Sequence, residues 1–518
     1  MKKLAILGIV FVASSAISMS FAQEEPDAKE MQQILRSDFF MGNFQENCAA
    51  CHGVKMQGTQ TMGPALVGVE FKNGETVADV IQSINKGNVD KGMPGFKGIL
   101  ADSEIKQLAI MVTERRVGRH FNDFKVDSKL VVPEGVLSTE KHDYRLETVA
   151  EGIDRLPFSI APLPDGSILV TEKTKGMRLI SADGKRSVEI KGAPRGYDDT
   201  GKSPGNKLVF GIGWVLDVVP HPEYEKNGWL YVQYGDRCSN CNNLSKETGE
   251  PVSMNKLVRA RIKNDTWVDE EVIWDADIED YTSATDMTAG GRITFDGEGH
   301  VFFSIGFKGP RNYMGIQDLS KPYGKIHRIK EDGRMPSDNP FVNTPKAIPS
   351  TWTYGHRSPQ GLEYDPRTGK LWNTEMGPRG GDELNRLLPG RNYGWPLYSL
   401  GLDYDGTPVE YGKDLGIEFN LKDIVQPKID WTPSPAISSF IIYDGDAFPE
   451  WKGDFIVGSL KGQELYRVEM NGDEFVRSET LLSGVARIRD IETAPDGTIV
   501  LLLEHESGGR VLRMVPTK

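Results

Sequence analysis

The sequence predicts a multidomain chain in which a small all-α domain is followed by an all-β six-bladed propeller. Three observations support this division. A Cys-x-x-Cys-His motif lies in a helical stretch, a segment of mixed charge without periodicity follows, and a repeat of paired strands fills the remainder. Within the 518 residues we place the helical domain at residues 23–118, a linker at 119–142 and the propeller at 143–518.

The strongest local signal is the motif Cys48-Ala49-Ala50-Cys51-His52. Two thiols at this spacing, followed at once by a histidine, are typical of haem c attachment. Each thiol would form a thioether with one vinyl group of the porphyrin, and His52 would then lie beneath the iron as an axial ligand. The alternatives are a structural disulfide, a redox Cys-x-x-Cys and half of a zinc site, although a zinc ribbon needs a second cysteine pair with its own knuckle.

A second axial ligand is expected later in the chain, and Met93 is the candidate. A thioether favours ferrous iron and raises the reduction potential, which suits electron transfer. Met56 and Met62 are the alternatives, but both lie close to the attachment site in sequence. We expect the carbonyl of Pro64 to accept a hydrogen bond from the other ring nitrogen of His52, which would fix the orientation of the ring.

Helical periodicity surrounds this motif. Phe44 precedes Cys48 on a predicted helix, and a second helix is predicted after a potential N-cap at Asp102. The apolar residues that follow helical spacing in this second helix are Ile105, Leu108, Ala109 and Val112. Two helices around a porphyrin would give so small a domain its core. Residues 23–118 resemble class I cytochrome c, and that resemblance covers this domain alone.

The start of the chain predicts export. Lys2 and Lys3 precede an apolar run, and small residues at Ser20 and Ala22 predict cleavage of a signal peptide, residues 1–22, after Ala22. We therefore expect a periplasmic or otherwise exported protein, which agrees with haem c attachment outside the cytoplasm. No later run is long and apolar enough to predict a membrane-spanning segment.

Charge and the remaining cysteines narrow the function classes further. The formal net charge of −13 argues against nucleic-acid binding. Four cysteines in so long a chain exclude a disulfide scaffold. In an oxidising compartment we expect Cys238 and Cys241 to form a local disulfide that staples one loop.

An internal repeat defines the propeller. Its unit is an apolar strand, a turn with Pro, Asp or Gly, and a second strand. The six copies lie at residues 162–170, 218–232, 294–303, 363–372, 441–457 and 493–501. Such units cannot bury both faces alone, and radial closure solves that problem. A pair of β-sandwiches and a seven-bladed ring with one degenerate copy are the alternatives.

The stretch from Tyr354 to Pro396 contains the motifs Gly355-His356-Arg357 and Gly377-Pro378-Arg379. With the six repeats, it resembles the soluble glucose dehydrogenase and aldose sugar dehydrogenase family, whose members use pyrroloquinoline quinone (PQQ). The resemblance extends over roughly residues 145–518. It implies that main-chain carbonyls of Gly377 and Pro378 hold a calcium ion, which would polarise the quinone as a Lewis acid.

PQQ is a polycarboxylate, so its pocket needs cations. The resemblance assigns this role to Lys461, Arg487 and Arg489, and it places Arg357 beside the reactive carbonyls as a catalytic and cofactor-binding residue. Strand alternation puts Arg487 and Arg489 on one face, which suits paired carboxylate recognition. The alternative is that these cations form surface salt bridges.

Three polar positions around the substrate differ from the family pattern. The general-base histidine corresponds to Thr288, its orienting aspartate to Phe307, and a substrate-contacting glutamine to Ile212. The residues that the resemblance assigns to cofactor binding are therefore retained, whereas the polar residues that would face the sugar are replaced. Asp286 is the carboxylate nearest in sequence to the lost base and is the candidate replacement, while the alternative is a solvated loop residue.

These observations predict a quinohaemoprotein dehydrogenase. A sugar-like or other alcohol would be oxidised through PQQ, and electrons would leave singly through haem c to an external one-electron acceptor. Two cofactors suit this role because a quinol releases electrons in a pair while a haem takes one. The alternatives are a non-catalytic, haem-bearing binding or sensor propeller and a propeller lactonase, which would need carboxylates and no quinone.

Overall fold

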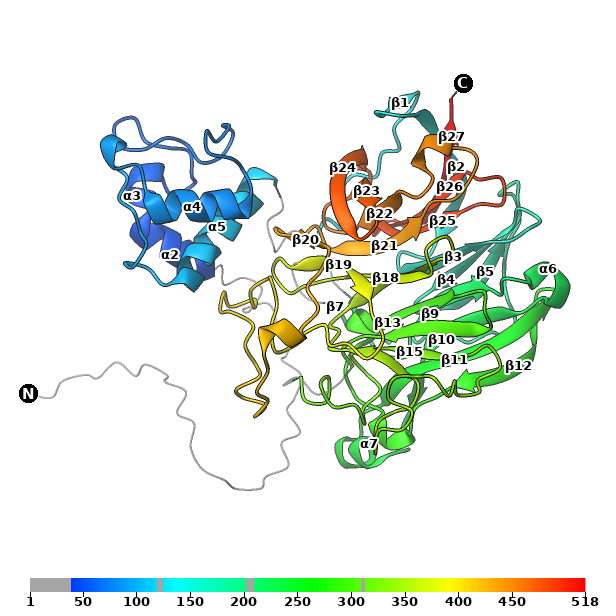
Figure 1. Cartoon of the computed structure of the whole chain (residues 1–518). Helices are drawn as coiled ribbons and strands as arrows, with labels where there is room; N and C mark the ends of the chain where they lie inside the picture. Colours follow the sequence, from blue (N-terminus) through cyan, green and yellow to red (C-terminus); the bar gives the residue numbers. More distant parts are fainter. Residues whose placement is uncertain (1–38, 119–123, 200, 203–208, 309–312, 518) are drawn as a thin grey trace, which may run out of the picture.

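The computed structural model describes residues 39–118, 124–199, 201–202, 209–308 and 313–517. It contains a small helical domain, blue in Figure 1, followed by a six-bladed β-propeller, so the predicted fold class is confirmed. The predicted signal peptide at residues 1–22 lies outside the described residues. Within the described ranges, no helix is both long and apolar enough to cross a bilayer.

The helical domain is built around one apolar cluster. Its helices are α2 (Phe39–Asn47), α3 (Ala49–His52), α4 (Val77–Lys86), the short 3-10 helix η1 (Val89–Lys91) and α5 (Asp102–Arg116). The prediction named only two of them, α2 and α5. It was also wrong by one position at α5, since Ala101 is the N-cap and its N–H donates to the Glu104 carboxylate at 2.7 Å.

The propeller blades are four-stranded antiparallel sheets, and in each blade the first strand named below is the innermost. The first blade contains β3 (Pro157–Pro162), β4 (Ile168–Glu172), β5 (Gly176–Ile180) and β6 (Ser187–Glu189). The second contains β9 (Val215–Pro220), β10 (Leu230–Cys238), β11 (Val252–Lys263) and β12 (Thr266–Trp274). The third contains β13 (Gly290–Phe295), β14 (His300–Ile305), β15 (Lys325–Lys330) and β16 (Thr351–Tyr354).

The remaining three blades follow the same plan. The fourth contains β17 (Pro359–Asp365), β18 (Lys370–Glu375), β19 (Asp382–Leu387) and β20 (Ile429–Trp431). The fifth contains β21 (Ile437–Ile442), β22 (Phe455–Ser459), β23 (Glu464–Asn471) and β24 (Glu474–Ser483). The sixth contains β25 (Arg487–Thr493), β26 (Ile499–Glu504), β27 (Gly509–Pro516) and β2 (Asp143–Ile153), with β1 (Leu137–Ser138) at its edge.

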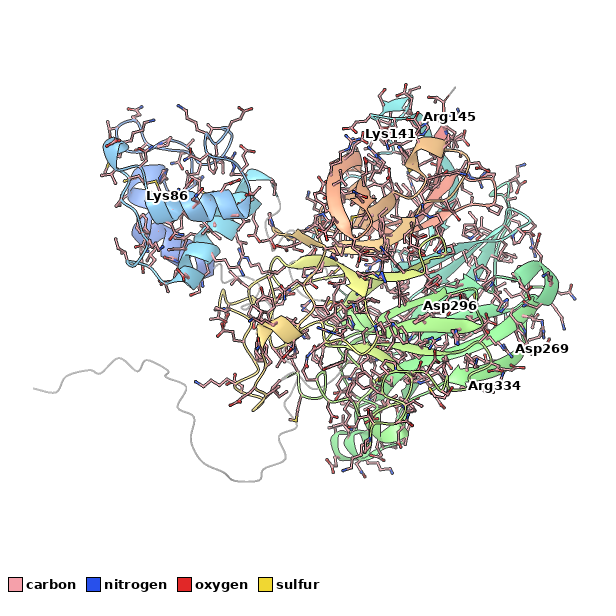
Figure 2. The ribbon with its side chains drawn as sticks, in the orientation of Figure 1. Lys86, Lys141, Arg145, Asp269, Asp296 and Arg334 are labelled. Atoms are coloured by element: carbon pink, nitrogen blue, oxygen red, sulfur yellow. A yellow bond between two sulfur atoms is a disulfide. The ribbon has the colours of Figure 1, made fainter. Side chains whose placement is uncertain are left out.

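The sixth blade joins the two ends of the propeller. Strand β2 pairs antiparallel with β27, and Tyr144 lies opposite Pro516. Figure 2 shows Lys141 and Arg145, at the start of the propeller, on the same edge as the last strand. The innermost strands contact one another in a closed ring, β3 to β9, β13, β17, β21, β25 and back to β3. Closure therefore covers the inner edges that a single blade would expose.

Strand direction explains where the site lies. Because neighbouring strands are antiparallel, successive connections alternate between the two ends of the propeller. The segment entering each innermost strand and the connection between the second and third strands of each blade therefore lie at the same end, which we call the site end. All the propeller residues predicted for the site fall in such segments or at their edges: Ile212, Asp286, Thr288, Phe307, Arg357, Gly377, Pro378, Lys461, Arg487 and Arg489.

Candidate functional site

The haem attachment motif lies where α2 meets α3. Cys48 and Cys51 are free thiols, and His52 is buried at the end of α3. The Nδ1 atom of His52 lies 2.8 Å from the carbonyl oxygen of Pro64, so the hydrogen bond predicted from the sequence is confirmed. This contact leaves Nε2 for the iron. The two thiols and the oriented imidazole fit a covalently attached haem.

The three candidate distal methionines lie in different environments. Met56 is buried in the apolar cluster of the helical domain, and Met62 is 62 % exposed. Met93 is partly exposed and follows η1, where its N–H and carbonyl pair with Asn88. Its assignment as the distal ligand stays a prediction.

A buried cationic cluster lies at the site end of the first and sixth blades. One carboxylate, Glu504, accepts from Lys173 Nζ at 3.0 Å, Arg487 Nε at 2.7 Å and Arg489 Nη2 at 2.6 Å. All of these side chains are at most 7 % exposed, so the alternative of surface salt bridges is wrong for them. Positive charge exceeds negative charge in this cluster, which suits an anionic ligand.

Lys173 was not predicted from the sequence. It follows β4, far in sequence from Arg487 and Arg489, and no local motif marks it. Burial, with Arg489 nearby, lowers the pKa of Lys173 to about 7, against the opposing effect of Glu504. Although burial favours the neutral acid, Arg489, Lys173 and Arg487 hold the pKa of Glu504 well below its usual range.

Arg357 lies on the loop between β16 and β17. The Glu375 carboxylate accepts from the Arg357 N–H and lies 2.8 Å from Nδ1 of the fully buried His356, which supports this loop. Arg357 Nη1 donates to the carbonyls of both Met376 and Gly377 at 3.1 Å. The carbonyls that meet Arg357 are therefore those of Met376 and Gly377, whereas the resemblance assigns calcium to Gly377 and Pro378. The calcium site stays a prediction.

Asp382 connects the Gly377 loop to the fifth blade. It accepts from Gly377 N at 3.0 Å, from Ser434 Oγ at 2.8 Å and from Ile437 N at 2.9 Å. Burial raises the pKa of Asp382 to about 6, and the nearby charge of Lys461 opposes this shift. Lys461, 6 % exposed, therefore lies close to the loop predicted to hold calcium.

Gln360, on β17, links the cationic cluster to the Arg357 loop. Arg489 Nη1 lies 3.5 Å from Gln360 Oε1, and Gln360 Nε2 donates to Ser358 Oγ at 3.0 Å. Ser358 directly follows Arg357. The structure therefore brings the predicted cofactor-binding residues of three blades into one region at the site end.

Two of the three positions that the resemblance predicts to differ from the family pattern are in contact. Thr288 Oγ1 donates to the carbonyl of Phe307 at 2.6 Å, so the residues predicted to stand at the family's histidine and aspartate positions are neighbours. The Phe307 ring contacts Tyr313 with centroids 4.9 Å apart, and Tyr313 contacts Trp395 and Tyr411 at 5.1 and 4.8 Å. We call these four aromatic residues the aromatic wall.

The aromatic wall borders Arg357. The guanidinium carbon of Arg357 lies 5.2 Å from the centroid of Trp395, and the N–H of Phe307 donates to the Arg357 carbonyl at 2.7 Å. Ile212 is partly exposed in the segment entering β9. Apolar side chains thus lie beside the residue predicted to face the reactive carbonyls.

Asp286 is not a solvated loop residue. Its carboxylate accepts from Trp214 N at 2.7 Å and forms an ion pair with Lys308, and both side chains are fully buried. Ser253 Oγ lies 3.5 Å from Oδ1 of Asp286 and 2.7 Å from Lys308 Nζ. Both oxygens of Asp286 are therefore occupied, which favours a structural role over the predicted role as general base.

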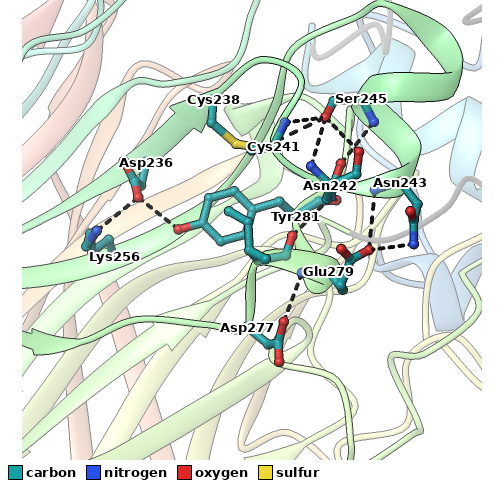
Figure 3. Close-up of a disulfide and its surroundings, with 11 residues drawn as sticks. Asp236, Cys238, Cys241, Asn242, Asn243, Ser245, Lys256, Asp277, Glu279 and Tyr281 are labelled. Carbon is teal, nitrogen blue, oxygen red and sulfur yellow. Dashed lines mark hydrogen bonds and ion pairs between the residues drawn. A yellow bond between two sulfur atoms is a disulfide. The ribbon is translucent and has the colours of Figure 1, made fainter.

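The disulfide also lies at the site end, between β10 and β11 (Figure 3). Cys238 and Cys241 are bonded, which confirms the sequence prediction. The following helix α7 (Asn243–Thr248) is capped by Asn242, whose side chain accepts from Ser245 N at 2.9 Å and donates to the carbonyl of Tyr281 at 3.0 Å. The stapled loop is thus anchored to the third blade's entering segment as well.

Comparisons with known proteins agree with both domains. Residues 154–513 match the family described as Glucose / Sorbosone dehydrogenase, and residues 41–110 match the family described as Cytochrome C oxidase, cbb3-type, subunit III. The uncharacterized protein slr1608 of Synechocystis sp. is 32 % identical over 73 % of this chain and 88 % of its own length. The aldose sugar dehydrogenase YliI of Escherichia coli K12 is 31 % identical over 72 % of this chain and 92 % of its own.

Solved structures show the same propeller. The apo-form of the soluble aldose sugar dehydrogenase from Escherichia coli superposes with a TM-score of 0.60 at 29 % identity, covering 72 % of this chain and all of that one. The PQQ-bound aldose sugar dehydrogenase from Streptomyces coelicolor gives a TM-score of 0.53 at 23 % identity over 72 % of this chain and 98 % of its own, and it supports the fold alone. This chain therefore belongs to the glucose/sorbosone dehydrogenase family of PQQ-dependent oxidoreductases and contains a cytochrome c domain ahead of its propeller.

Proposed function

We propose that this chain is an exported dehydrogenase that oxidises an alcohol-bearing substrate with bound PQQ and calcium and passes the electrons through haem c to an external one-electron acceptor. The main supporting observation is the surplus of buried positive charge around Glu504, linked through Gln360 to the Arg357 loop. A disulfide and a haem c motif both suit an oxidising compartment outside the cytoplasm.

We assign different parts of the cofactor site to different residues. Lys461, Arg487 and Arg489 would bind the cofactor carboxylates, with Lys173 as an additional partner. The carbonyls of Gly377 and Pro378 would hold calcium, and Arg357 would donate to the oxygens at the reactive end. PQQ, when bound, would supply a two-electron acceptor for the hydride of the substrate carbon. Burial of these cations excludes water and strengthens each charge interaction.

The substrate class follows from the aromatic wall. The relative YliI is named an aldose sugar dehydrogenase, but the resemblance predicts that Thr288, Phe307 and Ile212 replace three polar positions of the family. Sugar hydroxyls without partners are penalised in an apolar pocket. We propose a less polar alcohol or an unusual sugar derivative as the substrate, with ordinary aldoses turned over poorly.

Reconstitution tests the proposal. Purified protein containing haem is titrated with PQQ and calcium, and haem reduction is followed while sugars and less polar alcohols are added. We expect tight PQQ binding and substrate-dependent haem reduction that is faster with a non-sugar alcohol than with glucose. Absence of PQQ binding would leave a haem-bearing binding propeller, and rapid glucose turnover would show that the three substituted positions are misaligned.

A matched set of variants tests the cofactor residues. Replacing Lys461, Arg487 or Arg489 by Gln would leave a carboxylate of the cofactor without its partner, which typically costs about 2–5 kcal/mol. PQQ affinity should fall by orders of magnitude while haem content stays normal. Arg513→Gln, on the outer part of the sixth blade, is the control and should bind PQQ normally.

A further inference from the structure

Helix α5 has buried residues on all its sides. The consecutive residues from Leu108 to Glu114 are all buried. Consecutive helical residues point in every direction around the axis, so packing on one face cannot bury them all. Since α5 packs on α2 and α4 within its own domain, a second partner must cover the remaining side. The contacts of Gln107 and Glu114 identify the propeller as that partner.

A buried ion pair joins α5 to the fourth blade. Arg379 Nε and Nη2 lie 3.3 and 2.8 Å from the two carboxylate oxygens of Glu114, and the two side chains are 1 % and 2 % exposed. This two-point geometry restricts orientation as well as distance. Arg379 lies two residues after Gly377, on the loop predicted to hold calcium.

The loop Leu402–Gly406 contacts both domains. Leu402 is 1 % exposed and belongs to the apolar cluster of the helical domain, and the side chain of Gln107 donates to the carbonyl of Gly406. Between these two contacts, the Tyr404 hydroxyl accepts from Arg357 Nη2 at 3.2 Å. One short loop therefore contacts the haem domain at its ends and the candidate catalytic arginine at its centre.

Close backbone packing connects these two loops. The N–H and carbonyl of Arg379 pair with the carbonyl and N–H of Leu402, both at 3.0 Å. A Cβ atom added at Gly377 or at Gly401 would lie 2.2 Å from the carbonyl oxygen of Gly380. The segments 377–381 and 400–402 are thus closely packed, so the contact of Arg379 with α5 and the predicted calcium loop at Gly377 belong to one packed unit.

The linker runs over the same end of the propeller. Arg487 Nη1 donates to the carbonyl of Phe124 at 3.0 Å, and the N–H of Glu506 donates to the carbonyl of Val126 at 2.8 Å. Gln463 Nε2 also donates to the carbonyl of Lys125 at 3.2 Å. Residues 124–126 of the linker are therefore hydrogen-bonded to the site end of the propeller, and Phe124 meets Arg487 of the cationic cluster.

We infer that α5 is a docking surface that fixes the haem domain on the cofactor loops of the fourth blade, with Glu114 and Arg379 as positioning residues for electron transfer between the two redox groups. The inference rests on the proposed function. It makes the haem domain a fixed electron exit, beside Gly377 and Tyr404, rather than a freely tethered carrier.

Two measurements on the full-length haem protein test the docking. Hydrogen exchange of residues 400–406, measured without PQQ, reports whether the loop stays covered. Stopped-flow haem reduction, compared with steady-state reduction of a dye that accepts electrons directly from the quinol, reports electron transfer. The variant is Glu114→Gln, and Glu70→Gln, at an exposed glutamate of the same domain, is the matched control.

Glu114→Gln removes one partner of a buried charge pair. Hydrogen exchange in residues 400–406 should become at least about tenfold faster, and haem reduction at least about tenfold slower. The rate of dye reduction should change by less than about twofold. Glu70→Gln should match the wild type. Leu402→Ser should reproduce the exchange result if Glu114→Gln does not fold. Wild-type exchange and wild-type haem reduction in Glu114→Gln would overturn the inference. Failure of the proposed function looks different, because the wild type would then reduce neither haem nor dye while the exchange comparison still tests docking.

Discussion

Asp286 and Lys308 form a buried pair in which neither charge has access to water. Asp286→Asn leaves the ammonium of Lys308 unpaired in the interior, and breaking such a pair typically costs about 3–5 kcal/mol. We expect a large fall in the free energy of unfolding, measured by guanidinium denaturation. Asp269→Asn, at an exposed surface pair, is the control and should change the free energy of unfolding far less.

The same variant separates the two roles considered for Asp286. If Asp286→Asn keeps wild-type stability but slows haem reduction by substrate, the carboxylate acts as the general base after all. If the double variant Asp286→Asn/Lys308→Met recovers stability, the pair is structural. The three contacts of the carboxylate favour the second result.

Met93 is tested by the spectrum and the potential of the haem. Met93→Ala should abolish the weak iron–sulfur charge-transfer absorption and lower the reduction potential, because a thioether favours ferrous iron. Met62→Ala, at an exposed side chain, is the control and should change neither property. An unchanged spectrum in Met93→Ala would move the assignment to Met56 or Met62.

Lys173 gives the site a predicted pH dependence. Its pKa in the protein without cofactor is about 7, and a bound carboxylate would stabilise the protonated form and raise that pKa. Above pH 7, binding therefore takes up a proton, so PQQ affinity should fall as pH rises, by up to about tenfold per pH unit. Below pH 7 this group is already protonated and contributes no slope.

Calorimetric titration of PQQ between about pH 6 and 9 measures this effect. Lys173→Met should remove the slope and weaken binding at the lower pH. Lys175→Met, at a largely exposed lysine of the same turn, is the control and should keep the slope. An affinity independent of pH in the wild type would exclude Lys173 from the carboxylate site.

Among the elements, the loop between β10 and β11 is held by both a disulfide and the hydrogen bonds of Asn242. Its closed loop is short, so the loop-closure relation gives only about 2 kcal/mol for the bond. Cys238→Ser/Cys241→Ser should lower the free energy of unfolding by no more than that amount in chemical denaturation. The caps and hydrogen bonds of Asn242 should hold the loop, so PQQ binding should be unchanged.

Elements that contain their own signal were predictable. Each repeat copy includes two strands and the turn between them, and all six copies coincide with the hairpins formed by the first two strands of the blades. The haem motif and the His52–Pro64 contact are similarly local. Helix α4 was missed although it has a complete capping box of Thr76 and Asp79, a signal that the sequence does contain.

The parts that could not be predicted depend on partners far apart in sequence. Glu504 forms ion pairs with cations of the first and sixth blades, and no motif near Glu504 in sequence identifies Lys173 as one of them. The sequence makes Asp286 a candidate general base because its partner Lys308 lies on another connection and does not show as a partner in the sequence. For α5, the predicted apolar stripe described one face only, and the residues that meet the propeller do not form a second stripe.

At the scale of the whole molecule, we expect the propeller to bind its cofactor without the haem domain but to be less stable without it. A protein of residues 124–518 retains both β2 and all the residues predicted to bind PQQ, so it should bind PQQ and reduce the dye while lacking haem. It should be less stable than the full chain, because Arg379 and Leu402 lose the cover of α5. Thermal unfolding with and without PQQ measures both effects, and an unchanged unfolding temperature would argue against this contribution of α5.

The pairing of β2 with β27 determines when the propeller can be completed during synthesis. The sixth blade contains β2, which is synthesised early, and β27, which is synthesised last. The ring therefore stays open until nearly the whole chain has been synthesised. The haem attachment motif emerges long before that point. Maturation of the cytochrome can therefore precede closure of the ring, and any chain that stops short of β27 would expose unpaired strand edges on β2 and β26 that invite aggregation and degradation.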